Sequence, residues 1–303
     1  MMAKWLLATV LVATALTQPA MAEPRQTLGW GRMFDNDLIG DGKDRWHSGS
    51  YTVSAVRGPN WNGILPTRFG EILEFRFVGG TKVPANLEFP AADDRRYVAP
   101  LSLGLYTHFD WRGFETSLGA NLVLTGPQTG IGSFQSWLHG VLNVPKPDLG
   151  DQIGNAAHPT LQAEIGRTFA LSDTATLRPF VAAQAGVETY VRAGGDLVVG
   201  SFGKGALMLR DDVTGQRYRA INGAHIPAMS FTLGGDVARV FDSAYLPSGG
   251  AAVASETRTR IRAGVQWQGE KASTFYGITY LSPEFDSQPE GQVVGSLNVN
   301  LRF

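Results

Sequence analysis

Apolar and polar residues alternate with a period of two over much of the chain from residue 26 onward. The last such segment has two different faces. Its apolar face consists of Val293, Gly295, Leu297, Val299, Leu301 and Phe303, and its polar face of Ser296, Asn298, Asn300 and Arg302. Each segment is close to the ~9–11 residues that a tilted β-strand needs to cross a bilayer. The pattern therefore predicts membrane-crossing strands with one face toward lipid.

Twelve such strands are predicted, and an even number is expected of a single-chain bacterial barrel. They lie near residues 26–36, 47–57, 68–78, 97–109, 113–125, 158–170, 175–188, 189–202, 226–240, 255–268, 272–283 and 292–303. The stretch 175–202 could also form one long strand with a decorated loop. No internal repeat or linker is visible, so we expect one all-β domain over residues 23–303, a transmembrane antiparallel β-barrel.

A soluble β-sandwich with one buried face is the alternative fold. Three features favour the barrel: the strands are long, short turns such as 268–271 alternate with long loops at 79–96 and 126–156, and the chain ends on Phe303. A terminal aromatic residue is typical of outer-membrane barrels, where the barrel assembly machinery is expected to recognise it. With both termini expected in the periplasm, the two long loops would be extracellular.

The first 22 residues predict a cleaved secretory signal peptide. Lys4 gives a positive start, residues 5–16 are apolar, and Ala20-Met21-Ala22 forms a cleavage site that leaves Glu23 as the first mature residue. The apolar run is shorter than the ~20 residues that a membrane-spanning helix requires.

One segment departs from the alternation. In residues 131–142, which lie in a long loop, apolar residues recur at helical spacing, which predicts a short amphipathic helix. Gln135 and His139 are four residues apart and would share one face of it.

Composition narrows the function. Charged residues make up 17% of the chain and the formal net charge is −1, so nothing indicates a nucleic-acid partner. The absence of cysteine excludes a thiol nucleophile and a zinc–thiolate site.

Oxygen-rich side chains gather where the first predicted strand ends. Asn36 follows Asp35 and precedes Asp37, and Asp41 and Asp44 come shortly afterwards. Hard oxygen ligands suit calcium, although the spacing is not that of an EF-hand and a solvated, Asp-rich turn has the same composition.

Other candidates lie near the same expected end of the barrel. His139 could act as a general base or be structural, and two other histidines of the region compete with it. Ser48 could be a nucleophile or one of a row of hydroxyls that point into the barrel. Lys82 and Arg95 carry charges that suit a phosphorylated lipid, although cations at this rim also contact lipopolysaccharide in barrels of other functions.

Four segments resemble the lipid A 3′-O-deacylases, the LpxR family. They are FDNDLIGDGKDRWHSGS (34–50), DDRRYVAPLSLGLY (93–106), GPQTGIGSFQSWLHG (126–140) and DQIGN (151–155), and Phe303 agrees as well. The order and spacing of the segments carry the resemblance, which is distinctive mainly in residues 27–155.

The resemblance implies an outer-membrane enzyme that hydrolyses the ester-linked 3′-acyl (acyloxyacyl) chain of lipid A, the lipid part of lipopolysaccharide. His139 would activate a water molecule near neutral pH. Calcium held by Asn36 and Asp37 would stabilise the oxyanion. Such a mechanism needs no serine nucleophile.

The resemblance also assigns supporting roles. Ser48 stands where the family has a threonine and keeps its hydroxyl, and Gln135 stands at the helix glutamine; both would position water or substrate. The family's catalytic lysine falls on Lys82. Arg95 is a candidate substrate contact because of its charge, not because of the resemblance. The chain departs from its relatives at Ala156, where they often have an acidic residue.

Two other functions stay open at this stage. A porin or a lipopolysaccharide-binding barrel would need a passive lumen, which the expected inward-facing Arg258, Arg260 and Arg262 would instead help to fill. An outer-membrane serine phospholipase would use Ser48 or Ser133 together with a histidine.

Overall fold

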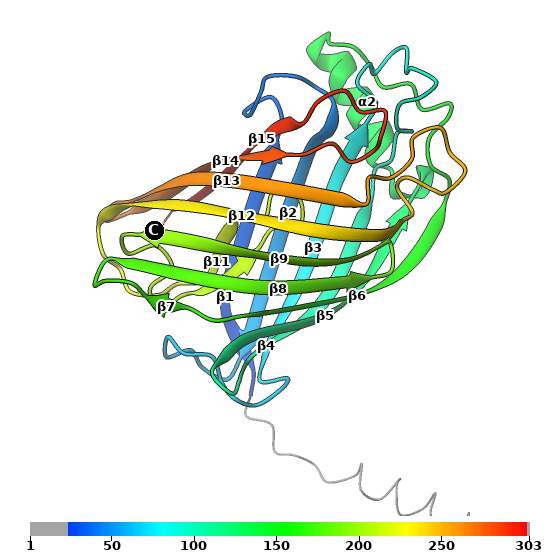
Figure 1. The fold of residues 1–303 in the computed structure, drawn as a ribbon. Coiled ribbons are helices and arrows are strands. Elements are labelled where there is room, and N and C mark those ends of the chain that lie inside the picture. Colours follow the sequence, from blue (N-terminus) through cyan, green and yellow to red (C-terminus); the bar gives the residue numbers. More distant parts are fainter. Residues whose placement is uncertain (1–23, 302–303) are drawn as a thin grey trace, which may run out of the picture.

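The computed structural model describes residues 24–301, so the predicted signal peptide and Phe303 lie outside the described residues. Figure 1 shows a closed barrel whose strands cross at a steep angle on its two sides. The wall consists of β1 (Gln26–Asn36), β2 (Trp46–Gly58), β3 (Ile72–Val83), β4 (Leu101–Trp111), β5 (Phe114–Thr125), β6 (Ala156–Gly166), β7 (Phe169–Ala170), β8 (Ala175–Ala185), β9 (Glu188–Val199), β12 (Ala228–Ser243), β13 (Thr257–Gln268), β14 (Ala272–Leu281) and β15 (Gln292–Leu301).

Neighbouring wall strands pair antiparallel in the order β6-β5-β4-β3-β2-β1-β15-β14-β13-β12-β9-β8, and pairing of β6 with β8 closes the sheet. The two-residue β7 pairs with β8 beyond the end of β6, so β6 and β7 act as one wall strand. Within residues 24–301 this gives the predicted twelve-stranded barrel, and the stretch 175–202 forms two strands, β8 and β9.

The period of two in the sequence matches the burial of each strand. Along β13, Arg258, Arg260 and Arg262 are buried inside the barrel, whereas Ile261 and Trp267 are exposed on the outside. Closing the sheet gives each wall strand a neighbour on both sides, as a lipid environment requires, although β1 and β15 pair only over Phe34–Asn36 and Gly295–Leu297. No helix among residues 24–301 is both long enough and apolar enough to cross a membrane.

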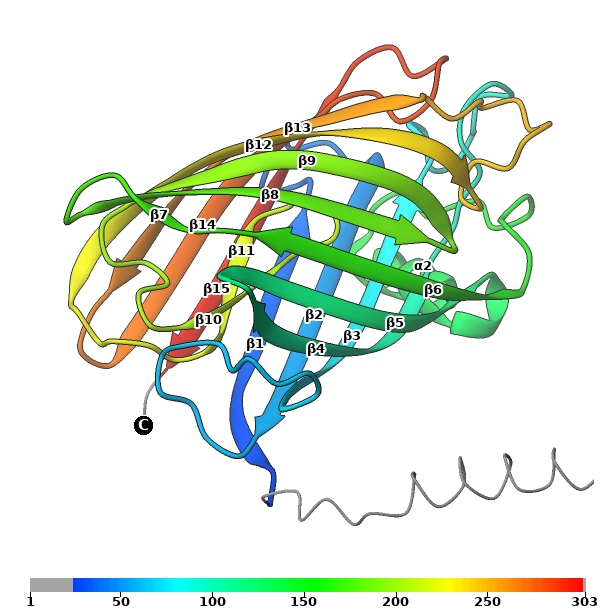
Figure 2. The same ribbon diagram turned by 60° about the horizontal axis from the view of Figure 1, so that its bottom comes forward.

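A short hairpin inside the barrel was not predicted. The connection between β9 and β12 folds back into the lumen as β10 (Leu207–Arg210) and β11 (Arg217–Ile221), which pair with each other (Figure 2). Leu209 and Tyr218 of this hairpin pack against the wall residues Met33, Val56 and Phe275 in a buried apolar cluster. The hairpin therefore gives the lumen an apolar core that occupies part of it.

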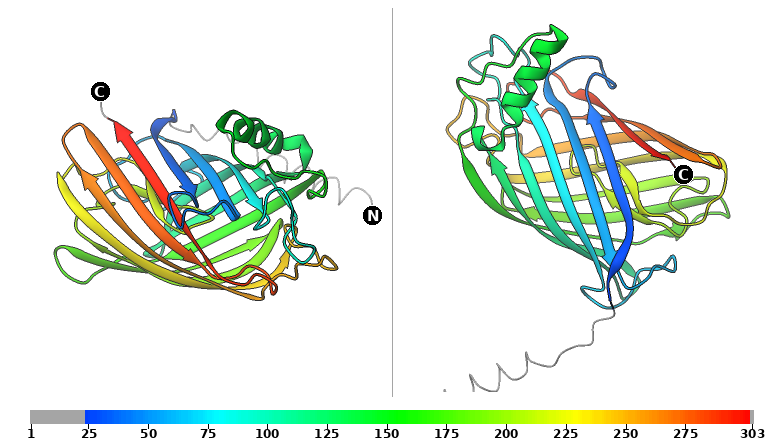
Figure 3. Two further views of the ribbon diagram at one scale, coloured as in Figure 1. Left: turned by 90° about the horizontal axis from the view of Figure 1, so that it is seen from above. Right: turned by 180° about the vertical axis from the view of Figure 1, so that it is seen from behind.

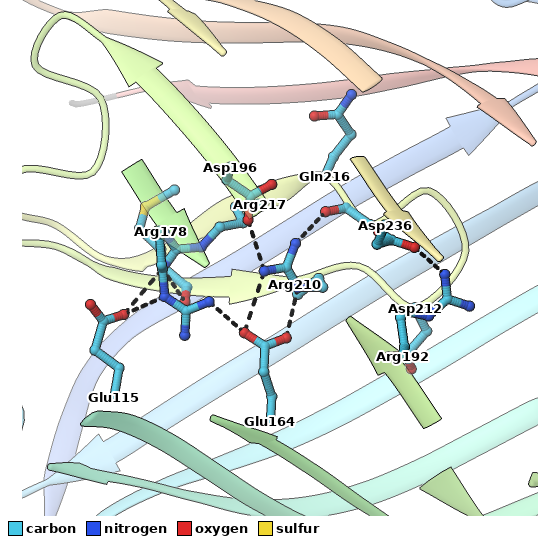
Figure 4. A network of polar contacts seen from close by, with 12 residues as sticks. Glu115, Glu164, Arg178, Arg192, Asp196, Arg210, Asp212, Gln216, Arg217 and Asp236 are labelled. Atoms are coloured by element: carbon cyan, nitrogen blue, oxygen red, sulfur yellow. Dashed lines mark hydrogen bonds and ion pairs between the residues drawn. The ribbon is translucent and has the colours of Figure 1, made fainter. Parts of the chain in front are cut away.

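Charged side chains occupy more of the lumen (Figure 4). Arg178 pairs with Glu115 at 2.6 Å and Glu164 at 2.7 Å, and Arg210 pairs with Glu164 and with Asp196, at 2.7 and 2.8 Å. The prediction of inward-facing charges is confirmed, but the expected filling is incomplete. A cavity of about 840 Å³ remains beside the hairpin, lined in part by these residues.

The loops divide the barrel into two ends. The end that we call the helix end carries the connections β1–β2, β3–β4, β5–β6, β12–β13 and β14–β15; the β5–β6 connection contains the 3₁₀ turn η1 (Pro127–Thr129) and the helix α2 (Ile131–Leu142). The opposite end, the turn end, carries the β4–β5 and β13–β14 turns and both ends of the described chain. The helix predicted over 131–142 is confirmed with the same bounds.

Candidate active site

Helix α2 directs Gln135 and His139 toward the barrel and several large apolar side chains away from it. It follows Gly130, which has a left-handed φ of 70°, a conformation that glycine adopts without steric cost. Gln135 and His139 are buried, whereas Phe134, Trp137 and Val141 are 59%, 60% and 64% exposed. In water this pattern would be unfavourable, so the exposed apolar side chains are typical of contact with lipid.

The helix lies on the outer side of the wall. In the view from behind (Figure 3, right), α2 stands in front of the ends of the cyan strands. The neighbouring Phe75 and Phe77 of β3 are exposed, and Gly79 continues that outer face. A Cβ built on Gly79 would lie 3.5 Å from Ile131 Cδ1, so the start of α2 packs directly on the outer surface of β3.

Asn36, at the end of β1, also faces outward. Met33 and Asp35 of β1 are buried in the lumen and Phe34 is exposed, which places Asn36 on the outer face. Its Nδ2 donates a hydrogen bond to the carbonyl oxygen of Ser48 at 2.8 Å. Gly49 lies opposite, and a Cβ there would come within 2.9 Å of that Nδ2, so glycine leaves room for the amide.

Ser48 is the extra residue of a β-bulge, because His47 and Gly49 pair with consecutive residues of β3. Its Oγ donates a hydrogen bond to Asp44 Oδ1, in the β1–β2 connection, at 2.6 Å. The alternation of β2 predicts Ser48 in a row of lumen hydroxyls. That prediction is wrong for Ser48, since the bulge interrupts the alternation, and holds for Ser50, which bonds to the buried Asp35.

The tautomer of His139 follows from its contacts. Nδ1 lies 2.5 Å from the carbonyl oxygen of Pro145, which can only accept, so Nδ1 carries the proton. The lone pair of Nε2 then points into the site, 3.8 Å from Asp44 Oδ2 and 3.5 Å from Gln135 Nε2. This is the tautomer that a general base requires.

Gln135 is held in turn by Tyr97, whose hydroxyl donates to Gln135 Oε1 at 2.8 Å. The structure thus joins four predicted site residues, Asn36, Ser48, Gln135 and His139, by way of two that were not predicted as catalytic. Asp44 links Ser48 to His139, and Tyr97 fixes Gln135. The sequence places Asp44 only in an acidic run, and Tyr97 only at the start of a strand that in fact begins at Leu101.

Asp37 is buried next to this group. Its Oδ2 accepts a hydrogen bond from the backbone N–H of Arg45 at 2.8 Å. Burial, opposed by that hydrogen bond and reinforced by the charges of Asp44 and Asp41, raises the pKa of Asp37 to about 8. The carboxylates are therefore close enough to repel one another, and a bound cation would relieve that repulsion.

The donors near Asp37 fit calcium in their chemistry, because they are carboxylate, amide and hydroxyl oxygens. Within residues 24–301, no group of three or more His, Asp or Glu side chains is arranged to hold a metal ion. Calcium usually has about 6–8 oxygen ligands, so water and substrate would have to supply most of them here.

Lys82 and Arg95 lie elsewhere, around Glu284 of the β14–β15 connection. Glu284 Oε1 is 3.3 Å from Lys82 Nζ and 2.8 Å from His47 Nε2, and Oε2 accepts a hydrogen bond from Arg95 Nη1. Burial opposes ionisation of Glu284, but His47, Lys82 and Arg95 hold its pKa well below the usual value. The structure groups Lys82 with Arg95 and does not bring either to His139; their catalytic and substrate-binding roles stay predictions.

Replacing Glu284 with glutamine should destabilise the barrel. The change leaves the buried charges of Lys82 and Arg95 without their shared carboxylate, and breaking a buried pair costs roughly 3–5 kcal/mol. Urea unfolding in detergent micelles, followed by gel mobility, should show a lower midpoint. Glu290→Gln is the matched control, since Glu290 pairs with Arg45 and Lys43 at the surface. Equal midpoints for the two variants would contradict a structural role of the cluster.

A family model described as "Outer membrane protein LpxR" matches residues 6–303 of the chain. No curated protein sequence matches it. Among solved structures, LpxR from Salmonella typhimurium is similar with a TM-score of 0.74 and 16% identity, over 91% of this chain and all of that one.

More remote similarities are to other barrels. The COG4313 outer membrane channel from Pseudomonas putida F1 aligns over 94% of this chain and 99% of its own, with a TM-score of 0.44 and 13% identity. The KdgM porin aligns over 91% and 98%, with a TM-score of 0.39 and 7% identity.

Proposed function

Because the chain belongs to the LpxR family of outer-membrane proteins, we propose that it is a lipid A deacylase that hydrolyses an ester in the outer leaflet. The observation that carries the proposal is the placement of His139. Its Nδ1 is held by Pro145, and its unprotonated Nε2 lies near Asp44 Oδ2 and Gln135 Nε2, between α2 and the barrel wall. A buried imidazole with one nitrogen fixed and the other directed into a polar site is suited to general-base catalysis.

The location of the site suits a substrate that stays in the membrane. Asn36 and α2 lie on the outer side of the wall, and the apolar face of α2 continues the exposed apolar surface of β3. An ester in the acyl region of a lipid could therefore reach the site from the bilayer without entering the lumen. With both termini on the periplasmic side, as expected of an even-stranded outer-membrane barrel, the helix end faces the outer leaflet, where lipid A lies.

The chemistry that we propose is attack by water on the ester carbonyl. His139 Nε2 takes a proton from the water as its oxygen bonds to the carbonyl carbon, which gives a tetrahedral oxyanion. The protonated imidazole then returns the proton to the departing alkoxide as the C–O bond breaks. The products are a free fatty acid and a hydroxyl group on the lipid.

The other site residues would orient the reactants. Gln135, fixed by Tyr97, and Ser48, fixed by Asp44, would position water or substrate beside Nε2. Asn36 and Asp37 would hold a calcium ion, which when bound would supply positive charge for the carbonyl oxygen.

The resemblance of the four sequence segments to the 3′-O-deacylases supports the 3′-acyl (acyloxyacyl) chain as the one released. Incubation of the purified protein with lipid A and, separately, with phosphatidylethanolamine, followed by mass spectrometry, tests substrate and bond together. Release of the 3′-acyl chain from lipid A is expected. Release from the phospholipid alone would contradict the proposal.

The geometry argues against Ser48 as the nucleophile of a serine phospholipase. A serine nucleophile would donate its hydroxyl proton to a histidine. Ser48 Oγ instead donates to Asp44, and Ser48 therefore suits a positioning role.

The lumen argues against a porin. The β10–β11 hairpin and the ion pairs of Arg178 and Arg210 occupy it. We expect that the purified protein in planar bilayers gives no stable conductance steps, because the hairpin and these ion pairs obstruct the lumen. Stepwise conductance that persists in His139→Ala would favour a pore.

A further inference from the structure

We propose that Asp44 is a positioning residue of this site, which orients the attacking water and then stabilises the protonated form of His139. The inference rests on the proposed function and adds a role to it. Asp44 lies in the β1–β2 connection, at the position where the loop passes α2.

The two oxygens of the Asp44 carboxylate have different partners. Oδ1 accepts the Ser48 hydroxyl proton at 2.6 Å, and Oδ2 lies 3.8 Å from His139 Nε2. Within residues 24–301 no lysine or arginine pairs with Asp44, whereas the neighbouring Arg45 pairs with Asp41 and Glu290. Its negative charge is therefore directed at His139 and is not neutralised by a basic side chain.

The fixed tautomer of His139 creates a place for a water molecule between His139 and Asp44. With the proton on Nδ1, His139 Nε2 and Asp44 Oδ2 are two acceptors that face each other. A water molecule has two protons and can donate one to each, so the pair defines a place for water beside the base. The Ser48 hydrogen bond holds the carboxylate in that orientation.

Proton transfer changes His139 Nε2 from an acceptor to a donor toward the Asp44 carboxylate. Once Nε2 has taken a proton from water, the imidazolium becomes a donor that faces a carboxylate. An opposite charge at about 4 Å favours the charged form of a histidine. Asp44 therefore stabilises the state that forms as water attacks more than the state before it, which is the condition for acceleration.

Other groups near His139 do not provide this charge. Gln135, itself held by Tyr97, is a neutral partner of Nε2, and Pro145 offers a backbone carbonyl to Nδ1. Lys146, which follows α2, lies beside Gly140 of that helix, where a Cβ would come within 3.0 Å of its Nζ.

The test uses the full-length protein and three variants in a lipid A hydrolysis assay over a range of pH. Asp44→Asn removes the charge and Asp44→Glu keeps it. Asp151→Asn is the matched control, since Asp151 lies in the same connection as α2, is largely exposed and pairs with Arg96. Heat-modifiable gel mobility first shows that each variant is folded.

For Asp44→Asn we expect kcat to fall about tenfold, because a tenfold change in rate corresponds to a change of about one pH unit in the proton affinity of the base. We expect KM to stay within about twofold of the wild-type value. The acidic limb of the pH–rate profile should move to lower pH, because His139 gains its proton less readily without the carboxylate. Asp44→Glu should restore part of kcat and of the limb, and Asp151→Asn should match wild type. A purely structural role would not move the limb.

A folded Asp44→Asn variant with wild-type kcat and an unmoved limb would overturn the inference while leaving the deacylase proposal intact. If Asp44→Asn does not fold, Asp44→Ser removes the same charge and is read in the same way. A wild-type protein that releases no acyl chain would refute the proposed function, and the inference with it, before any variant is compared.

Discussion

Replacing His139 with alanine is expected to lower the rate of lipid A hydrolysis by roughly 10²–10⁴-fold, the usual contribution of a general base. His139 is the residue with a nitrogen that is both fixed in its tautomer, through Pro145, and directed at the place where water would be activated. Alanine leaves Ser48, Asp44 and Gln135 in place but provides no acceptor for the proton of water.

The variant should fold, because His139 lies on a helix outside the wall rather than in the sheet or in the lumen. His225→Ala is the matched control. His225 lies at the turn end and bonds to Gln268 at 2.7 Å, far along the strands from α2. It should hydrolyse lipid A at the wild-type rate. The measurement compares the rates of lipid A hydrolysis of the two folded variants. A His139→Ala protein as active as His225→Ala would contradict the proposed role of His139 as the general base.

Removal of divalent cations is the second change with a large expected effect. Loss of an electrostatic stabiliser of an oxyanion costs roughly 10²–10³-fold in rate. Burial first, and then the charges of the nearby Asp44 and Asp41, raise the pKa of Asp37, so a cation bound at this carboxylate would relieve an unfavourable charge.

We expect that exhaustive chelation of the purified protein reduces hydrolysis by that factor and that added calcium restores it better than magnesium, which demands a smaller and more regular set of ligands. Asp37→Asn keeps the acceptor for the backbone of Arg45 and removes the charge, so it should raise the calcium concentration needed for half-maximal activity. Full activity after chelation would contradict the calcium proposal.

Much of the wall was predictable from the sequence, because lipid on one side and a polar lumen on the other impose alternation on every strand. All twelve strands and the helix over 131–142 follow from that rule and from helical periodicity. The hairpin β10–β11 does not follow from it. Its apolar side chains are buried against Met33 and Phe275, residues far away in the sequence, so no local pattern indicates its place in the lumen.

In the site, too, local features were predictable from the sequence and long-range contacts were not. Gln135 and His139 share a helix face, which spacing alone predicts. The partners of that face come from other connections: Asp44 from β1–β2 and Tyr97 from β3–β4. The orientation of Ser48 depends on a one-residue bulge, and the surroundings of Lys82 depend on Glu284, about two hundred residues away. These contacts join residues that are far apart in the sequence. The sequence therefore indicated which residues belong to the site but not which of them contact one another.

We propose that this barrel removes an acyl chain from lipid A by means of His139. The most direct measurement is mass spectrometry of lipid A from cells that produce the wild-type protein or the His139→Ala variant, each shown to be folded in the outer membrane. The account predicts a lipid A species that lacks the mass of one ester-linked 3′-acyl chain in the wild-type cells and its absence in the variant. Unmodified lipid A in cells with folded wild-type protein, with calcium present, would contradict it.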